Sequence, residues 1–151
     1  MGSVPVDAQK HGMSRLAEDF RRTDYVFEYD GRCTVLHIDA ASGDLAALHL
    51  RHDVSESAYI TACNPGCRIV TDAENEAAMA SLRREIRALG LVCFEGQAMD
   101  SDGKWPPEPS LLVLGLSAHR ALAMASRYGQ YALLLAGADA RPRLEWTGLT
   151  P

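Results

Sequence analysis

The run from Leu111 to Leu116 limits the fold more than any other stretch, because apolar residues follow one another there without a polar break. A strand with one solvated face alternates polar and apolar residues, whereas an unbroken run is typical of a strand covered on both faces or central in its sheet. The length of 151 residues favours one domain, and a hydrophobic content of 47% allows a core without metals or disulfides. We therefore expect a layered domain with this strand inside its sheet.

The segments around this run have the spacing of short strands. Asp30-Gly31 separates two strand-like segments and is a favoured hairpin turn, because that turn type needs positive φ. Residues 98–110, which include three prolines, are expected to form a long loop. The predicted strands are 25–29, 33–38, 58–62, 91–97, 111–116 and 131–136, with a last edge strand at 143–147.

Helices are predicted where a capping residue precedes apolar residues at helical spacing. The strongest pattern covers residues 72–89. Thr71 and Glu74 have the spacing of a capping box, and Gly90 is the expected residue just after the helix. Three further helices are expected to be capped by Ser14, Ser42 and Ser117 and to end near Thr23, His52 and Gly129.

This order of hairpins and crossover connections predicts the α+β class. We expect a two-layer α/β sandwich formed by residues 13–148, with a mixed sheet of five to six strands and three to four helices. Residues 1–12 are small, polar and aperiodic, which favours a disordered lead-in. A small doubly wound sheet is the alternative architecture.

Composition excludes several classes of function. A net charge of −5 and a pI of about 5.5 argue against a nucleic-acid-binding surface, which normally carries a basic surplus. The sequence has no apolar run long enough for a transmembrane helix, so no membrane partner is expected. The first residues lack the apolar core of a signal peptide. We therefore expect a cytoplasmic protein whose four cysteines are reduced thiols.

Hydrogen-bonding side chains are concentrated in residues 59–75, where a strand is expected to end. Strand ends are positions at which α/β domains often carry function. Pro65 restricts Asn64 to an extended or turn conformation, so Thr61 and Asn64 would project from the strand end toward a ligand. Asn75 follows one turn into the next helix. Turn formation alone is the alternative role of Asn64.

Two distant segments offer further polar groups. Glu108 has a proline on each side and Trp105 nearby, and a carboxyl group in apolar surroundings can serve as a general acid or base. Its alternative role is that of an exposed loop residue or the partner of an arginine. Gln130 lies where a buried strand is expected to begin and could face the same cleft, or it could cap the backbone.

No metal or cofactor site is expected. Cys63 and Cys67 are close in sequence, but neither Cys33, Cys93 nor the histidines supply a second ligand pair of zinc-binding spacing. Phosphate-binding glycine motifs do not occur, and acidic residues at the start of the helix at 72–89 would repel an anion. The two cysteines of the pair are expected to be small packing residues, and a redox pair is the alternative, although the spacing of thioredoxin-like pairs is tighter.

Several short motifs occur in order along the chain: RxTDY from Arg21, YITACNP from Tyr59, AEN from Ala73, WPPEPSLLVLGLS from Trp105 and RYGQYA from Arg127. With these motifs the chain resembles the bacterial domain-of-unknown-function family 3293 from about Arg21 to Leu135. The resemblance implies a small bacterial protein and carries no established activity. In similar proteins the residue at the position of Cys63 is commonly aromatic, and the residue at the position of Cys67 is commonly not a cysteine. Both differences weaken a metal role further. The motif residues that map here are Thr23, Tyr25, Thr61, Asn64, Pro65, Asn75, Trp105, Glu108, Ser110, Gly115 and Gln130.

Three hypotheses of function follow. The first is a binding module in which five side chains converge on a small polar molecule or a protein partner: Thr61, Asn64, Asn75, Glu108 and Gln130. The second is a small hydrolase or transferase that uses Glu108 as general acid or base. The third is an interaction domain that forms a homodimer through the edge strand at 143–147.

Overall fold

The computed structural model describes residues 6–150, and within this range the side chains of residues 12–150. Its helices are α1 (Val6–Arg21), α2 (Gly43–Arg51), α3 (Asp72–Ala88) and α4 (Ala118–Arg127), and a short 3-10 turn is η1 (Pro65–Cys67). Its strands are β1 (Thr23–Tyr29), β2 (Arg32–Leu36), β3 (Ser57–Ile60), β4 (Cys93–Asp100), β5 (Glu108–Leu114), β6 (Ala132–Ala136) and β7 (Arg143–Trp146). No helix in this part of the chain is long and apolar enough to cross a membrane.

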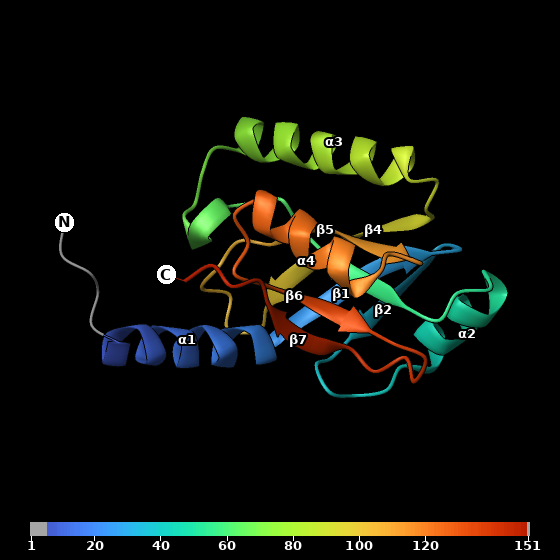
Figure 1. Cartoon of the computed structure of the whole chain (residues 1–151), viewed down its shortest axis with the longest axis horizontal. Helices are drawn as coiled ribbons and strands as arrows, with labels where there is room; N and C mark the ends of the chain where they lie inside the picture. Colours follow the sequence, from blue (N-terminus) through green and yellow to red (C-terminus); the bar gives the residue numbers. More distant parts are fainter. Residues whose placement is uncertain (1–5, 151) are drawn as a thin grey trace.

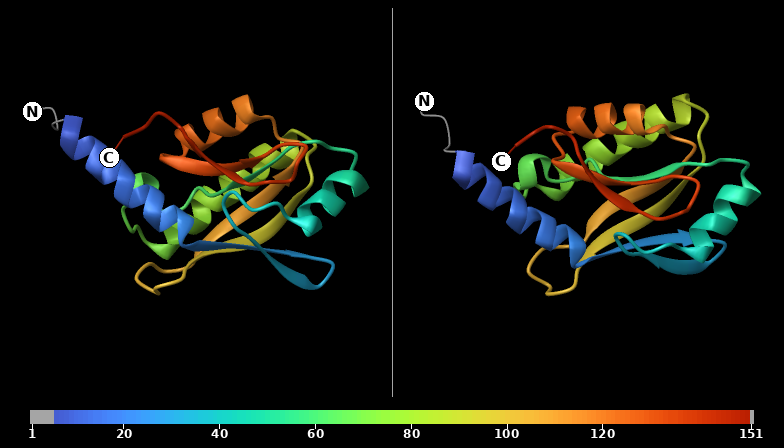
Figure 2. Two further views of the ribbon diagram at one scale, coloured as in Figure 1. Left: turned by 90° about the horizontal axis from the view of Figure 1, so that it is seen from below. Right: turned by 60° about the horizontal axis from the view of Figure 1, so that its bottom comes forward.

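The seven strands form one curled sheet in the order β2-β1-β4-β5-β3-β6-β7 (Figures 1 and 2). Every hydrogen-bonded pair of strands in the described chain is antiparallel, so the predicted mixed sheet of five to six strands is wrong. The helical crossovers do join parallel strands, β3 to β4 and β5 to β6. In each case one antiparallel strand is inserted between the two, so no parallel pair becomes adjacent.

The central part of the fold has a recurring topology. The elements β3-α3-β4-β5-α4-β6, with sheet order β4-β5-β3-β6, form the ferredoxin-like arrangement of two interleaved βαβ units. The β1-β2 hairpin extends this sheet beyond β4, and β7 extends it beyond β6. This topology supports many unrelated activities, so it does not by itself indicate a function.

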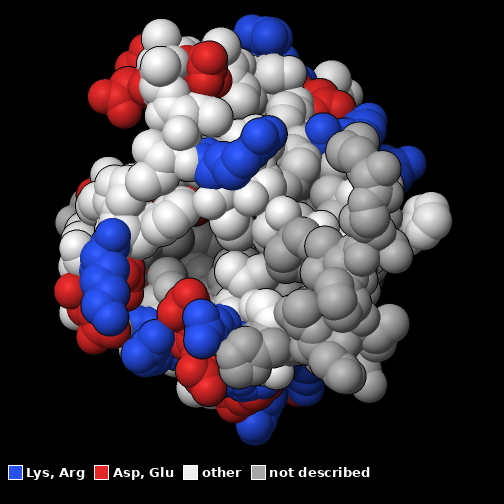
Figure 3. Space-filling view, turned by 90° about the vertical axis from the view of Figure 1, so that its left-hand side faces the viewer, with Lys and Arg blue, Asp and Glu red and all other residues white. Residues whose placement is uncertain are grey.

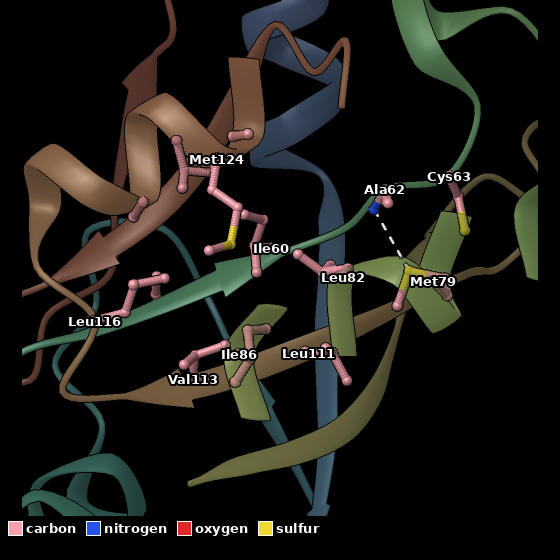
Figure 4. Packing of buried hydrophobic residues seen from close by; sticks show 14 residues of the cluster. Ile60, Ala62, Cys63, Met79, Leu82, Ile86, Leu111, Val113, Leu116 and Met124 are labelled. Atoms are coloured by element: carbon pink, nitrogen blue, oxygen red, sulfur yellow. Dashed lines mark hydrogen bonds between the residues drawn. The ribbon is translucent and has the colours of Figure 1, made fainter. Parts of the chain in front are cut away.

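Apolar residues are buried on both faces of the sheet. On one face α3 and α4 cover a cluster that includes Ile60, Leu82 and Met124 (Figure 4). On the opposite face α2 packs against the curled sheet, which makes the predicted two-layer arrangement too simple. The β5 residues alternate between the two clusters, and residues 111–114 are all buried. The expectation that this run is a central strand covered on both faces is confirmed, and the α+β class holds.

Local predictions were correct where a side chain fixes the backbone. Thr71 and Glu74 form the predicted capping box of α3, and Ser42 and Ser117 cap α2 and α4. The first helix was placed wrongly, since α1 begins at Val6 rather than at Ser14. Of the predicted lead-in, residues 1–5 lie outside the described residues.

The predicted loop at 98–110 is shorter than expected and covers only residues 101–107. The two strands that flank it continue further, because Ala98 pairs with Glu108 across β4 and β5. This pairing draws Glu108 out of the loop and fixes it as the first residue of a central strand.

Candidate functional site

A cavity of about 240 Å³ opens where β3 leaves the sheet. It lies on the sheet face opposite α3 and α4, between the end of α1, the turn after β3 and the loop between β4 and β5. Figure 3 shows this side of the molecule, with a hollow bordered by both acidic and basic side chains. The walls of the cavity come from segments that are distant in sequence.

The floor of the cavity follows from the register of three strands. Tyr25, Ala98 and Glu108 face one another across β1, β4 and β5, so their side chains lie on the same face of the sheet. All three line the cavity. The methyl group of Ala98 between two larger side chains leaves space above β4.

A second small residue in β4, Gly96, lets the side chain of Tyr59 extend along the face of the sheet. The Tyr59 hydroxyl on β3 donates a 2.7 Å hydrogen bond to the carbonyl oxygen of Val26 on β1, across two intervening strands. It passes 3.1 Å from where a side chain on Gly96 would begin, and the Val26 carbonyl oxygen lies only 2.1 Å from the same point, so only glycine fits there. Burial raises the pKa of Tyr59 and of Tyr25, and both hydroxyls are therefore neutral at physiological pH.

Asn64 fixes the turn that follows β3. Its backbone has φ 49° and ψ 61°, a left-handed conformation that asparagine tolerates better than most residues. The Oδ1 atom accepts hydrogen bonds of 3.1 Å from the Val70 backbone N–H and from the Asn75 amide. The Asn64 backbone N–H in turn donates to Oδ1 of Asn75 at 2.9 Å. Asn64 is only 5% exposed, so these bonds satisfy a buried polar group.

Glu108 is held by two donors at the wall of the cavity. Its Oε1 atom accepts a 2.9 Å hydrogen bond from Nδ2 of Asn64 and a 2.8 Å bond from Nε1 of Trp105. No group among the described residues donates to its second oxygen, Oε2. The carboxylate therefore has a fixed orientation and one oxygen that remains able to accept a hydrogen bond.

The loop that carries Trp105 is organised by a neighbouring carboxylate. The Asp100 side chain accepts hydrogen bonds from the backbone N–H groups of Asp102, Lys104 and Trp105, at 3.1, 3.0 and 3.1 Å. These bonds lower the pKa of Asp100, so its carboxylate is charged. Asp100 was not predicted from the sequence as part of a site.

Gln130 joins the end of α4 to the same turn. Its Nε2 atom donates to the carbonyl oxygens of Cys63, at 2.8 Å, and of Tyr128, at 3.3 Å. The Gly66 N–H donates to the carbonyl oxygen of Gly129 at 2.8 Å. These bonds hold the turn against α4, and Oε1 of Gln130 accepts no hydrogen bond within the described residues.

Thr61 links the strand end to the start of β5. Its hydroxyl donates to the carbonyl oxygen of Pro109 at 2.7 Å and accepts from the Cys63 N–H at 3.0 Å. Of the five predicted site residues, Thr61, Asn64, Glu108 and Gln130 line the cavity. Asn75 does not line it but is bonded to Asn64. The structure thus brings the five together, while their role in binding a ligand stays a prediction.

Much of the cavity wall was missed from the sequence. The missed residues include Phe20 at the end of α1 and the pair Tyr25 and Tyr59. The two tyrosine rings pack edge to face with centroids 5.4 Å apart. The RxTDY motif contains Tyr25 and could have drawn attention to it, whereas nothing in the pattern of α1 indicates that its last turn would close a cavity.

The thiols of Cys63 and Cys67 are protonated at neutral pH. Cys63 and Cys67 are free thiols, and desolvation raises the pKa of both, that of Cys67 to about 11. A thiol of such a pKa is protonated and weakly nucleophilic at neutral pH. Within the described residues, no group of three or more His, Cys, Asp or Glu side chains could hold a metal ion.

Comparison with known proteins finds a matching family model. The family model described as "Protein of unknown function (DUF3293)" matches residues 60–133. The chain resembles this family. The matched residues run from the end of β3 into β6 and contain all five predicted site residues. No curated protein and no solved structure matches the chain.

Proposed function

We propose that this DUF3293-like protein is a small binding module and that the cavity holds its ligand, a small polar molecule or a polar group of a protein partner. One observation carries the proposal: the Glu108 carboxylate is fixed by Asn64 and Trp105 at the cavity wall, and its second oxygen has no donor among the residues that the structure describes. A carboxylate held in this way is oriented before the ligand arrives, which reduces the entropy lost on binding.

The polar residues of the site have two kinds of role in this proposal. Glu108 and Gln130 contact the ligand, because each lines the cavity and has an acceptor oxygen that no described residue occupies. Thr61, Asn64 and Asn75 act as positioning residues, because their polar groups are already bonded to other parts of the chain. The buried rings around them supply the apolar part of the contact.

The alternative, a small hydrolase or transferase with Glu108 as general acid or base, has less support. Ser110 is the nearest hydroxyl in sequence, and it donates to the backbone carbonyl of Glu108 rather than to its carboxylate. The Cys67 thiol lines the cavity but is protonated at neutral pH. Neither residue is an activated nucleophile as it stands.

Filling the cavity tests the binding proposal. Ala98→Leu adds bulk between Tyr25 and Glu108, whereas Ala123→Leu adds the same bulk on the exposed side of α4 and serves as control. Ligands would be sought with a library of polar fragments and detected by amide chemical-shift changes in the ¹⁵N-labelled protein. We expect saturable shifts around the cavity that are lost in Ala98→Leu and kept in Ala123→Leu. Fragments that bind Ala98→Leu as well as the parent protein would contradict the proposal.

A further inference from the structure

We infer that the ligand of this cavity carries a positive charge, as an amine or guanidinium group attached to a compact apolar body. The inference rests on the proposed binding function and specifies its chemical class. It is drawn from three properties of the cavity: the fixed carboxylate of Glu108, the aromatic walls and the balance of charge.

The fixed carboxylate is complementary to a cation that donates hydrogen bonds. Oε2 of Glu108 and Oε1 of Gln130 are both acceptors without donors among the described residues that surround them. Ammonium and guanidinium groups are donors only and carry the charge that a carboxylate favours. An anionic ligand would meet two acceptors and a negative charge at the same wall.

The walls of the cavity suit the same class of ligand. Five aromatic side chains line it: Phe20, Tyr25, Tyr59, Trp105 and Tyr131. Aromatic faces attract cations through the ring quadrupole and also pack against apolar groups. A volume of about 240 Å³ suits a compact molecule.

The charge balance of the lining is negative. Four acidic side chains, Asp19, Asp100, Asp102 and Glu108, face two basic ones, Arg22 and Lys104, an excess of two negative charges. Arg22 is already bound to Asp19 at 2.8 Å and to Asp102 at 3.4 Å. The carboxylates of Asp100 and Glu108 form no ion pair within the described residues, and that of Glu108 has only the two neutral donors Asn64 and Trp105.

Lys104 provides a way to change this balance without disturbing the fold. Its side chain is exposed and forms no ion pair in the described structure, and only its backbone N–H is bonded, to Asp100. Lys104→Met should therefore raise the affinity for a cation. Glu108→Gln should lower that affinity and still let Oε1 accept from Asn64 and Trp105, because the glutamine amide keeps a carbonyl oxygen.

The test compares benzylamine, benzyl alcohol and benzoate, which share a ring and differ in charge. Affinities would be measured by chemical-shift titration of the parent protein, Glu108→Gln and Lys104→Met at low salt. We expect benzylamine to bind at least about tenfold more tightly than either analogue, since one such charge interaction is worth about 1.4 kcal/mol. Glu108→Gln should remove most of this preference, and Lys104→Met should increase it.

The outcomes separate this inference from the proposed function. Equal or tighter binding of benzyl alcohol or benzoate at the cavity would overturn the charge inference and leave the binding module standing. If none of the three probes shifts cavity resonances, and the polar fragment library also fails, both are overturned. Where benzylamine binds with the expected preference, titrations with N-acetylarginine amide and with free agmatine distinguish a partner's side chain from a free small molecule.

Discussion

The side-chain amide of Asn64 donates a 2.9 Å hydrogen bond to Oε1 of Glu108, between residues 44 positions apart in the sequence. The bond ties the turn after β3 to the first residue of β5. Because Asn64 is also bonded to Val70 and Asn75, the orientation of the Glu108 carboxylate depends on the whole turn from β3 to α3. The stability of the turn and the geometry of the cavity are therefore coupled.

Replacing Asn64 should destabilise the protein in two separable ways. Asn64→Ala loses buried hydrogen bonds and keeps a side chain in the left-handed region, so we expect the free energy of unfolding to fall by about 3 kcal/mol. Asn64→Gly loses the same bonds without the conformational cost, and its loss should be about 1 kcal/mol smaller. Urea unfolding measures both. Equal losses in the two variants would show that the left-handed backbone contributes no strain.

Trp105 should report occupancy of the cavity through its fluorescence. The protein has two tryptophans, and Trp146, which packs edge to face on Phe20, can be changed to Phe so that only Trp105 emits. In this background benzylamine should change the emission saturably, because the Trp105 indole shares the Glu108 carboxylate with the ligand. Adding Glu108→Gln should lower the affinity for benzylamine, measured from this change in emission, about tenfold. An unchanged response in the double variant would place the ligand away from Glu108.

Gly96→Ala should destabilise the sheet strongly. A methyl group at this position would come within 2.1 Å of the Val26 carbonyl oxygen, and backbone atoms cannot move aside cheaply. We expect a loss of at least about 2 kcal/mol, measured by thermal or urea unfolding. Gly43→Ala is the matched control, because nothing lies within 4 Å of the added group and alanine favours the first turn of α2. A loss in Gly43→Ala as large as that in Gly96→Ala would refute the steric explanation.

His49 should make the protein less stable as the pH falls. Its ring is buried, Nε2 lies 2.8 Å from the Ser57 hydroxyl, and Nδ1 has no partner in the described structure. Burial lowers its pKa below the ordinary 6.5. The unfolded chain therefore binds more protons between the two pKa values, and stability falls as the pH drops below about 6.5.

The measurement is the melting temperature between about pH 5 and pH 7.5. His49→Gln, which keeps a polar group near Ser57, should reduce the slope of melting temperature against pH. His37→Gln is the control, because His37 is exposed and lies outside the buried clusters. If His49→Gln retains the full slope, other groups cause the pH dependence.

The sequence alone determined those features that depend on neighbours along the chain. The capping box of Thr71 and Glu74 and the hairpin at Asp30-Gly31 require only local geometry, and both were predicted correctly. The central position of residues 111–114 also followed from their composition, since a strand covered on both faces needs apolar residues at every position. Four polar residues that line the cavity, Thr61, Asn64, Glu108 and Gln130, were predicted for a related reason, because they lie at strand and helix ends.

Tertiary structure decided what depends on contacts between distant segments. The antiparallel sheet could not be predicted from the crossovers, because the insertion of β5 between β3 and β4 is a long-range choice that no local pattern encodes. The closure of the cavity by α1, the passage of Tyr59 over Gly96 and the hydrogen bond from Asn64 to Glu108 likewise join residues far apart in sequence. Periodicity reports which side of an element is buried, whereas the partner on that side is fixed only when the whole chain packs.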